Sequence, residues 1–468
     1  MKTTETHIVI GAGIAGCLSA LFRKRAGFRV ILLDRNRSEA SDAYPVCTET
    51  SNIVSENHSG AEYPFDPQSA RDCFDGRLNN EKFFPEIIYG GKDYTRIIAS
   101  QSMICAGVDI LARCRRNMDV IRTHYEQRCR EDTANRVFGN PDLLCQEIAG
   151  VDGVRDVAGA FVTPQRGLNP LFVATTLEWE LRCTGVEFRQ GACVTAIKPL
   201  NDGRYEVELQ DSESGQTEIV ADQVSLCSAA HAFQLAKWLK PDFAFPPIYM
   251  ALREILYVSL PDGTDKNFTC LKLENEYGGM LSPLNDECAM VYYPPAAHIL
   301  NCNLDPVSGN YPQQYRDFLA NGHPEQHERA RWTLEALRRF YPELNRSEIL
   351  GTYLKVAINS VADSRVRRNL GVYQLMPACT MTILPKWTMC VVNVRKEMDL
   401  VLGHSCSTGN MDREEMAHCR HEVANYQLET PAEWAIEPEL LRGLALRHAA
   451  NMKVPELLAK PMQSLIPS

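Results

Sequence analysis

The sequence lacks the cysteine spacing from which metal knuckles and dithiol redox motifs are built. It contains 17 cysteines but no C-x-x-C pair, and the closest two, Cys105 and Cys114, are nine positions apart. The histidine pairs with helical spacing also lack an acidic partner that would complete a ligand set, so we expect no metal. Scattered cysteines in odd number indicate reduced thiols that mostly pack in the core.

The sequence also lacks long apolar runs and an excess of positive charge. No run approaches the roughly 20 apolar residues that a helix needs to cross a bilayer, so we expect no membrane span. The first strand is predicted about six residues from the N-terminus, which leaves no room for a signal peptide and predicts a cytoplasmic protein. The net charge of -10 and the pI near 5.7 exclude the basic surface of a nucleic-acid binder, so small molecules are the expected partners.

One stretch carries most of the functional information. Residues 8–34, IVIGAGIAGCLSALFRKRAGFRVILLD, join a buried-strand pattern, a G-x-G-x-x-G, an amphipathic helix and a terminal acid. In such a unit the glycines allow a tight turn and let a pyrophosphate approach the helix N-terminus, while the acid binds the hydroxyls of an adenosine ribose. This combination predicts a dinucleotide site. Its expected contacts are Gly11, Gly13, Ile14, Ala15, Gly16, Asp34 and Arg35.

The organisation of the chain favours FAD over NAD. The fingerprint begins almost at residue 1, and no second G-x-G-x-x-G follows for a separate nicotinamide cofactor. A length of 468 residues with 45% hydrophobic residues is enough for two packed domains. We expect an α/β fold in which a Rossmann-like FAD-binding domain is interleaved with a smaller antiparallel-sheet substrate domain. The expected parts are an FAD-binding domain (1–95, 151–240 and 346–410), a helical insertion (96–150), a substrate domain (241–345) and a C-terminal helical tail (411–468).

Three stretches resemble the D-amino-acid oxidase superfamily of FAD-dependent oxidoreductases. The first is the N-terminal unit. The second, TSNIVSENHSGAEY at 50–63, is similar to a family segment that in several hydroxy-acid members holds N-S-G-x-I-H-x-G-x-x-Y beside the flavin. The third, TPQRGLNPLFVATTLEWEL at 163–181, resembles the family's turn and helix before a strand whose backbone binds FAD. The resemblance implies a glutathione-reductase-type FAD domain and cofactor contacts at Ser51, His58, Ser59 and, through the backbone, Val194.

Two segments depart from the family's pattern. Where the family usually has Ala-Gly at a strand end, this chain has Cys-Ser-Ala-Ala-His at 227–231, so we expect a different backbone spacing near the cofactor. The family's closing loop near the flavin pyrimidine ring has two possible matches, residues 403–409 and residues 385–388. We favour the second, because it opens a helix-like run whose N-terminus would support negative charge on a reduced flavin. It adds Lys386, Trp387 and Thr388 to the expected contacts.

His58 is the expected catalytic base, because imidazole titrates near neutral pH and the resemblance places this residue beside the flavin. A backbone-bonded loop histidine and a covalent flavin tether are alternative roles for it. Guanidinium groups bind carboxylates bidentately, so arginines in the substrate region are candidates for a carboxylate clamp, with surface or packing roles as the alternative. The candidates are Arg253, Arg365, Arg367 and Arg368, together with Tyr292 and Tyr293.

These observations predict an FAD-dependent oxidase or dehydrogenase. It would dehydrogenate a small amine, amino acid or 2-hydroxy acid by hydride transfer to flavin, and oxygen or another electron acceptor would regenerate the cofactor. A first alternative is an FAD-dependent monooxygenase that uses NAD(P)H and oxygen. A second is a non-catalytic flavin-binding protein or an RNA-modification partner, although the acidic charge counts against RNA.

Overall fold

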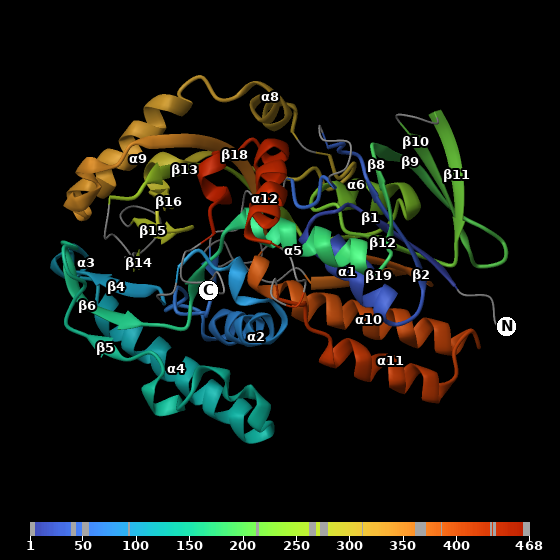
Figure 1. Cartoon of the computed structure of the whole chain (residues 1–468), viewed down its shortest axis with the longest axis horizontal. Helices are drawn as coiled ribbons and strands as arrows, with labels where there is room; N and C mark the ends of the chain where they lie inside the picture. The colour runs from blue at the N-terminus through green and yellow to red at the C-terminus, as the bar shows by residue number, and fades with distance from the viewer. Residues whose placement is uncertain are drawn as a thin grey trace.

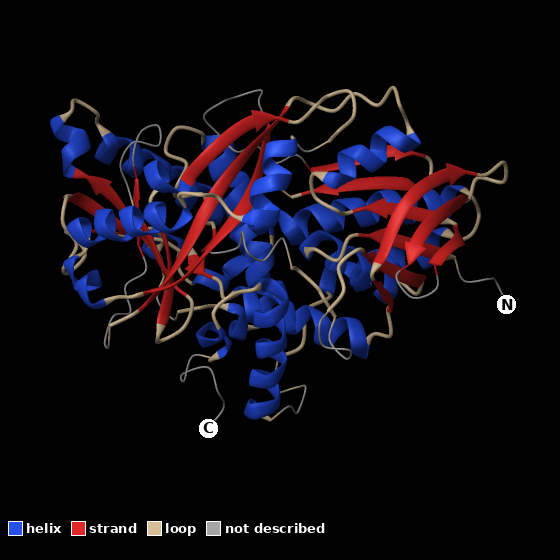
Figure 2. Ribbon diagram, turned by 90° about the horizontal axis from the view of Figure 1, so that it is seen from above, coloured by secondary structure: helices blue, strands red, loops and turns tan. Residues whose placement is uncertain are grey.

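A computed structural model of the chain places most of its strands in two large sheets toward opposite ends of the molecule, with helices between and around them (Figure 1, Figure 2). None of the helices in the described part of the chain combines the length and the apolar character that a membrane-spanning helix needs. The structure describes residues 5–38, 44–48, 56–91, 94–211, 215–261, 268–271, 279–310, 312–360, 371–384, 386–430, 433 and 437–461.

The six-stranded sheet holds the strand-helix-strand unit predicted at residues 8–34. Its strand order is β19-β20-β12-β1-β2-β8, and every neighbouring pair is parallel except β19 with β20. The apolar runs of β1 and β2 are buried on both faces, as the centre of a parallel sheet covered on both sides requires. The strands are β1 (Thr6–Ile10), β2 (Arg29–Asp34), β8 (Glu187–Gln190), β12 (Gln223–Leu226), β19 (Gly371–Met376) and β20 (Cys379–Ile383).

Alternate side chains of these strands pack in two different hydrophobic clusters. Val9 and Leu32 join the cluster of α1, α5, α10, α11 and α12, whereas Ile10 and Leu33 join that of α6 and a three-stranded sheet. Because both faces are covered, ligands are expected at the carboxyl ends of the strands. The covering elements are α1 (Ile14–Arg25), α5 (Pro170–Cys183), α6 (His231–Leu239), α10 (Cys390–Ser407), α11 (Arg413–Asn425), α12 (Pro438–Met452), β9 (Ala192–Pro199), β10 (Tyr205–Asp211) and β11 (Gly215–Ala221).

The nine-stranded sheet has the order β17-β13-β16-β15-β14-β4-β6-β5, with β18 also paired to β13, and only β4 with β14 is parallel. Leu256 and Val258 of β13 pack in the cluster of α9, whereas Ile255 and Tyr257 join the cluster of α1. One face is therefore turned toward the nucleotide-binding part. The elements are β4 (Arg96–Ser100), β5 (Glu147–Ile148), β6 (Val157–Val162), β13 (Ile248–Ser259), β14 (Phe268–Leu271), β15 (Met280–Pro283), β16 (Cys288–Tyr292), β17 (His298–Asn303), β18 (Ile349–Ser360) and α9 (Gln326–Phe340).

Four strands of this sheet come from segments that the sequence assigned elsewhere. β4 and β5 fall in the expected helical insertion, while β6 and β18 fall in expected FAD-binding segments, yet all four pair within the nine-stranded sheet. Local periodicity predicts a strand but not its partner, and β4 pairs with β14, which is far away in the sequence. The domain boundaries themselves stay a prediction.

Two of the remaining helices, α2 and α4, form a further packed unit. α2 and α4 pack against each other around a third hydrophobic cluster. The other elements are β3 (Glu56–Asn57), α2 (Pro67–Phe83), η2 (Glu86–Ile88), α3 (Gln101–Cys105), α4 (Ile110–Glu131), η3 (Thr133–Phe138), η4 (Pro141–Leu143), β7 (Arg166–Gly167), α7 (Pro294–Ala297), α8 (Gln313–Asn321), η5 (Pro342–Arg346), η6 (Trp387–Met389) and η7 (Glu456–Ala459).

Candidate functional site

The turn between β1 and α1 is built so closely that it requires glycine. Gly11 has a φ of +101°, and a Cβ there would lie 2.8 Å from the Cα of Ser228. A Cβ on Gly16, in the first turn of α1, would overlap the carbonyl oxygen of Gly11. The Gly11 N–H donates to the carbonyl oxygen of Leu33 at 2.8 Å, which ties the turn to the end of β2. The turn therefore has the close backbone approach predicted for a pyrophosphate.

The carboxylate of Asp34 stands beside this turn. It accepts hydrogen bonds from the backbone N–H groups of Ala12 at 2.6 Å and Asn36 at 2.8 Å, and Asp34 is 9% exposed. A carboxylate at the end of the second strand is the group that accepts the hydroxyls of a ribose in this motif. α1 begins at Ile14 with no acidic residue in its first turn, so its N–H groups and positive dipole end suit a phosphate.

A pocket opens between the turn, Asp34 and the segment after β12. The Oγ of Ser228 is buried there without a hydrogen-bond partner among the described residues, so a ligand would satisfy a polar group that the protein leaves unpaired. The glycine turn, the helix end, the ribose acceptor and this hydroxyl together fit FAD. The lining includes the predicted residues Gly11, Gly13, Asp34, Arg35 and Val194.

Sequence reasoning missed several residues that line the same pocket. Ala229 has a left-handed backbone with a φ of 50°, a conformation that glycine adopts most readily. The sequence feature that could have pointed to residues 228, 229 and 231 was the unusual composition of segment 227–231, which departs from the family's pattern near the cofactor. The missed residues include Asn36, Thr48, Ser228, Ala229 and His231.

The segment around His58 lies beside the start of α10. β3 pairs with β7, and the backbone N–H of His58, directly after β3, donates to the Oγ1 of Thr388 at 2.8 Å. This bond joins two predicted contacts that are 330 positions apart in the sequence. Lys386 is near the same loop, because its Nζ lies 3.9 Å from the ring centroid of Tyr63. The ring of Trp387 is not in this group of contacts, since it packs on Phe84.

The alternative match for the closing loop, residues 403–409, lies at the other end of α10. The 18 residues of this helix span about 27 Å, at 1.5 Å per residue. Ser405 there donates a hydrogen bond to Glu5 at 2.7 Å, next to the start of β1. Residues 386–388 are therefore the ones that lie near His58. Ser51 and Pro385 fall outside the described residues.

A buried carboxyl group, that of Glu56, and a partly exposed one, that of Glu62, flank His58, and sequence reasoning missed both. The Nδ1 of His58 lies 3.0 Å from the Oε2 of Glu62, whose Oε1 accepts a hydrogen bond from Gln165 at 2.9 Å. Glu56 is 3% exposed and accepts a hydrogen bond from Thr95 at 3.0 Å. Burial and the nearby charge of Glu62 raise the pKa of Glu56 from 4.5 to about 7. The only feature of the sequence that could have pointed to these two residues was their position, two residues before His58 for Glu56 and four after it for Glu62.

A row of side chains identifies the face of the nine-stranded sheet that meets the His58 loop. Ser282 of β15 is paired with Met290 of β16, and Met290 is paired with Tyr257 of β13, so the three share one face. Ser282 also hydrogen-bonds to Glu56, which immediately precedes the His58 loop. The face that carries Tyr257 is therefore turned toward His58.

Arg253 lies on the same face, because it is four residues from Tyr257 on β13. Its guanidinium carbon is 6.0 Å from the ring centroid of Tyr292, and its register partner on β18 is Lys355. The hydroxyl of Tyr292 and the Nε2 of His298 are 2.6 Å apart. Two cations beside two polar rings can bind a carboxylate. Sequence reasoning missed Lys355, because the register between β13 and β18 cannot be seen in either strand alone.

Tyr293 is not part of this group. Tyr293 contacts the ring of Trp332 on α9, with the centroids 6.1 Å apart, and α9 covers the opposite face of the sheet. Arg365, Arg367 and Arg368 fall outside the described residues, so their place in the clamp stays a prediction.

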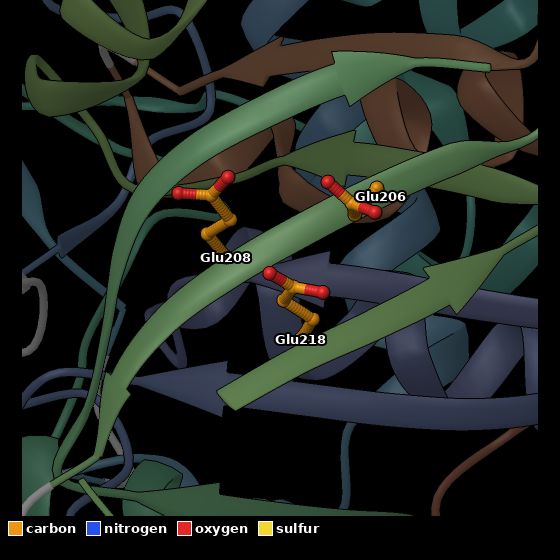
Figure 3. Close-up of side chains that lie close together, drawn as sticks. All are labelled: Glu206, Glu208 and Glu218. Atoms are coloured by element: carbon orange, nitrogen blue, oxygen red, sulfur yellow. The ribbon is translucent and has the colours of Figure 1, made fainter. Parts of the chain in front are cut away.

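One acidic cluster stands apart from the pocket. Figure 3 shows Glu206 and Glu208 on β10 and Glu218 on β11, and their carboxylate oxygens lie within 4.8 Å of one another. Lys198 of β9 forms ion pairs with Glu206 and Glu208, so the cluster already has a cationic partner. It lies on the outer face of the three-stranded sheet, because the alternate residues Val207 and Leu209 are buried against the six-stranded sheet. This arrangement gives no reason to place a metal there.

Comparison with known proteins agrees with this geometry. A family model described as FAD dependent oxidoreductase, DAO, matches residues 7–355. No curated protein matches the sequence significantly.

Similar solved structures include L-amino acid deaminase from Proteus vulgaris, with 13% identity and a TM-score of 0.58 over 86% of this chain and 94% of that one. Glycine oxidase from Geobacillus kaustophilus has 13% identity and a TM-score of 0.56 over 85% and 95% of the two chains. L-proline dehydrogenase from P. horikoshii has 11% identity and a TM-score of 0.55 over 88% and 96%. At such identities the likeness is one of fold.

Proposed function

This chain belongs to the DAO family of FAD-dependent oxidoreductases, with FAD as its cofactor, and on that basis we propose that it dehydrogenates a small amine, amino acid or 2-hydroxy acid that carries a carboxylate. One observation carries the proposal. The row Ser282, Met290 and Tyr257 puts the cations of the nine-stranded sheet on the face that meets the His58 loop. A base and a carboxylate clamp then border the same space.

In this proposal each group has a separate task. The turn at Gly11 and the N-terminus of α1 hold the pyrophosphate of FAD, and Asp34 holds the ribose. When bound, FAD supplies a hydride acceptor. Arg253 and Lys355 orient the substrate through its carboxylate, and His58 takes the proton from the amine or hydroxyl that is being oxidised.

The similar structures favour an amino acid among the three substrate classes. Those of L-amino acid deaminase, glycine oxidase and L-proline dehydrogenase share the fold, and all three names refer to amino acids. The electron acceptor is oxygen or another small or protein oxidant. A cytoplasmic location stays a prediction from the sequence.

An anaerobic titration of the purified flavoprotein tests the proposal. Amines, amino acids and 2-hydroxy acids are added one at a time while the visible absorption of the flavin is recorded. We expect one of these classes to bleach the flavin, and Arg253→Ala to raise the concentration needed without removing FAD. Bleaching only by NADH or NADPH would refute the proposal and favour a monooxygenase.

A further inference from the structure

The loop that carries His58 is held by side chains from distant parts of the chain. The backbone N–H of His58 donates to Thr388 of η6 at 2.8 Å. The next N–H, that of Ser59, donates to the Oε1 of Gln165 at 3.3 Å. Partners 330 and 106 positions away therefore fix two successive peptide groups. Such a shell holds a side chain in one geometry, as a catalytic group requires.

The following turn is equally constrained. Gly60 has a φ of +85°, and a Cβ there would overlap the carbonyl oxygen of Ala70 on α2. Asn117 of α4 donates from one amide nitrogen to the carbonyl oxygens of Gly60 and Ala61, both at 3.1 Å. The turn brings the side chain of Glu62 back beside that of His58, four residues earlier.

Glu62 is placed on one particular nitrogen of the imidazole. Its Oε2 lies 3.0 Å from Nδ1, and the two side chains are only 15% and 20% exposed. The amide of Gln165 that holds the Ser59 N–H also donates to the Oε1 of Glu62, so one side chain aligns the backbone and the carboxylate. With Nδ1 turned to Glu62, Nε2 is the nitrogen left to face a substrate.

We propose that Glu62 is the positioning residue of His58: its carboxylate, 3.0 Å from Nδ1, holds that side of the ring and leaves Nε2 to face the substrate. This rests on the proposed function. The substrate C–H bond breaks with both electrons as a hydride passes to FAD, the N–H or O–H proton passes to Nε2, and a C=N or C=O bond forms. Glu62 stabilises the imidazolium that results, as an acidic partner does for a catalytic histidine.

Flavin reduction in single-turnover experiments tests this role. The variants are Glu62→Gln, Glu62→Asp, His58→Asn and the double variant His58→Asn with Glu62→Gln. We expect Glu62→Gln to lower the limiting rate of flavin reduction by about 10- to 100-fold, with an apparent substrate affinity within about twofold, because the carboxylate acts on proton transfer. Glu62→Asp keeps the charge and recovers part of the rate.

The double variant separates a shared role from two independent ones. If Glu62 acts only through His58, the double variant reduces flavin no more slowly than His58→Asn alone. The proposal would be overturned if the fold-losses in the rate of flavin reduction of the two single variants multiplied in the double variant. So would a wild-type rate in Glu62→Gln, or in Glu62→Asp if the glutamine variant does not take up FAD.

A second histidine–carboxylate pair supplies a matched control. The Nε2 of His124 on α4 lies 2.9 Å from the Oδ1 of Asp75 on α2, outside the proposed site. Asp75→Asn also removes a carboxylate from beside a histidine, together with a hydrogen bond that Arg128 donates to Asp75. We expect flavin reduction in Asp75→Asn to match the wild type in rate and in pH profile.

A chemical measurement separates this inference from the proposed function. Diethylpyrocarbonate modifies neutral imidazole, and peptide mass spectrometry can follow the rate at His58. Glu56 and Lys386 also carry charge in this region, and the charge of Glu62 is one cause of the raised pKa of Glu56, so the comparison is made in a Glu56→Gln background. If the Glu62 carboxylate holds the ring, the rate of modification at His58, measured at one fixed pH, should differ between Glu62→Gln and the protein that keeps Glu62, both in that background.

The two readouts have distinct meanings. An unchanged modification rate at His58 in Glu62→Gln overturns the inference even if a substrate bleaches the flavin. A changed rate with no substrate that bleaches the flavin would keep the histidine–carboxylate pair and refute the proposed function.

Discussion

Glu56→Gln tests the buried carboxyl group beside His58 through stability. The pKa of Glu56 in the folded protein is about 7, against an ordinary value of 4.5. Below pH 4.5 both folded and unfolded states hold the proton. Between the two pKa values the unfolded state ionises while the folded state keeps its proton, so stability falls as pH rises. At about 1.4 kcal/mol for each unit of pKa, the loss approaches about 3 kcal/mol above pH 7.

Glutamine keeps the size of the side chain and cannot ionise. Urea unfolding of the wild type and of Glu56→Gln from pH 4 to pH 9 gives the difference between their free energies of unfolding at each pH. The contributions of titrating groups that the substitution leaves unchanged cancel in this difference. We expect this difference to change by about 3 kcal/mol in favour of the variant, mostly between pH 5 and pH 7. Glu147→Gln is a useful control, because its exposed ion pair with Arg115 lowers the pKa of Glu147 and gives a change of opposite sign at acid pH. A pH-independent difference for Glu56→Gln would refute the reasoning.

Three further predictions concern the cofactor and substrate. Gly16→Ala should abolish FAD binding, because its Cβ overlaps the carbonyl oxygen of Gly11, and the purified protein should be colourless. Ser228→Ala removes an unpaired buried hydroxyl and should weaken FAD binding about 5- to 10-fold by flavin fluorescence titration, a loss of about 1 kcal/mol; unchanged binding would contradict a contact with FAD. Arg253→Ala should raise the apparent Kd of a carboxylate substrate about 10- to 100-fold in stopped-flow reduction, the value of a lost charged hydrogen bond, whereas Tyr293→Phe should leave it unchanged.

The nucleotide cradle could be predicted because its chemistry is local. The close approach of Gly16 to Gly11 involves residues five positions apart, and β1, α1 and β2 follow one another without interruption. The acid at Asp34 ends the second strand, as the motif requires. A sequence pattern contains all of this information.

The rest of the site depends on contacts between distant segments. His58 and Thr388 were each proposed for the flavin region, but no sequence pattern shows that one hydrogen bond joins them. Glu62 acquires its place from Gln165, which is 103 positions away. The partner of Arg253 on β18 depends on strand register, which the hydrophobic pattern of a strand buried on both faces does not specify.

The order of the strands along the chain has a consequence for how this molecule can be divided. The six-stranded sheet takes β1 and β2, then β8 and β12, then β19 and β20, while β4 to β6 and β13 to β18 go to the other sheet. No contiguous fragment contains either whole sheet alone, so the two should melt as one cooperative unit. Exchange of the nine-stranded sheet as one contiguous block is excluded by this layout. Under the proposed function, a new specificity would come from single substitutions on strands such as β13 and β18.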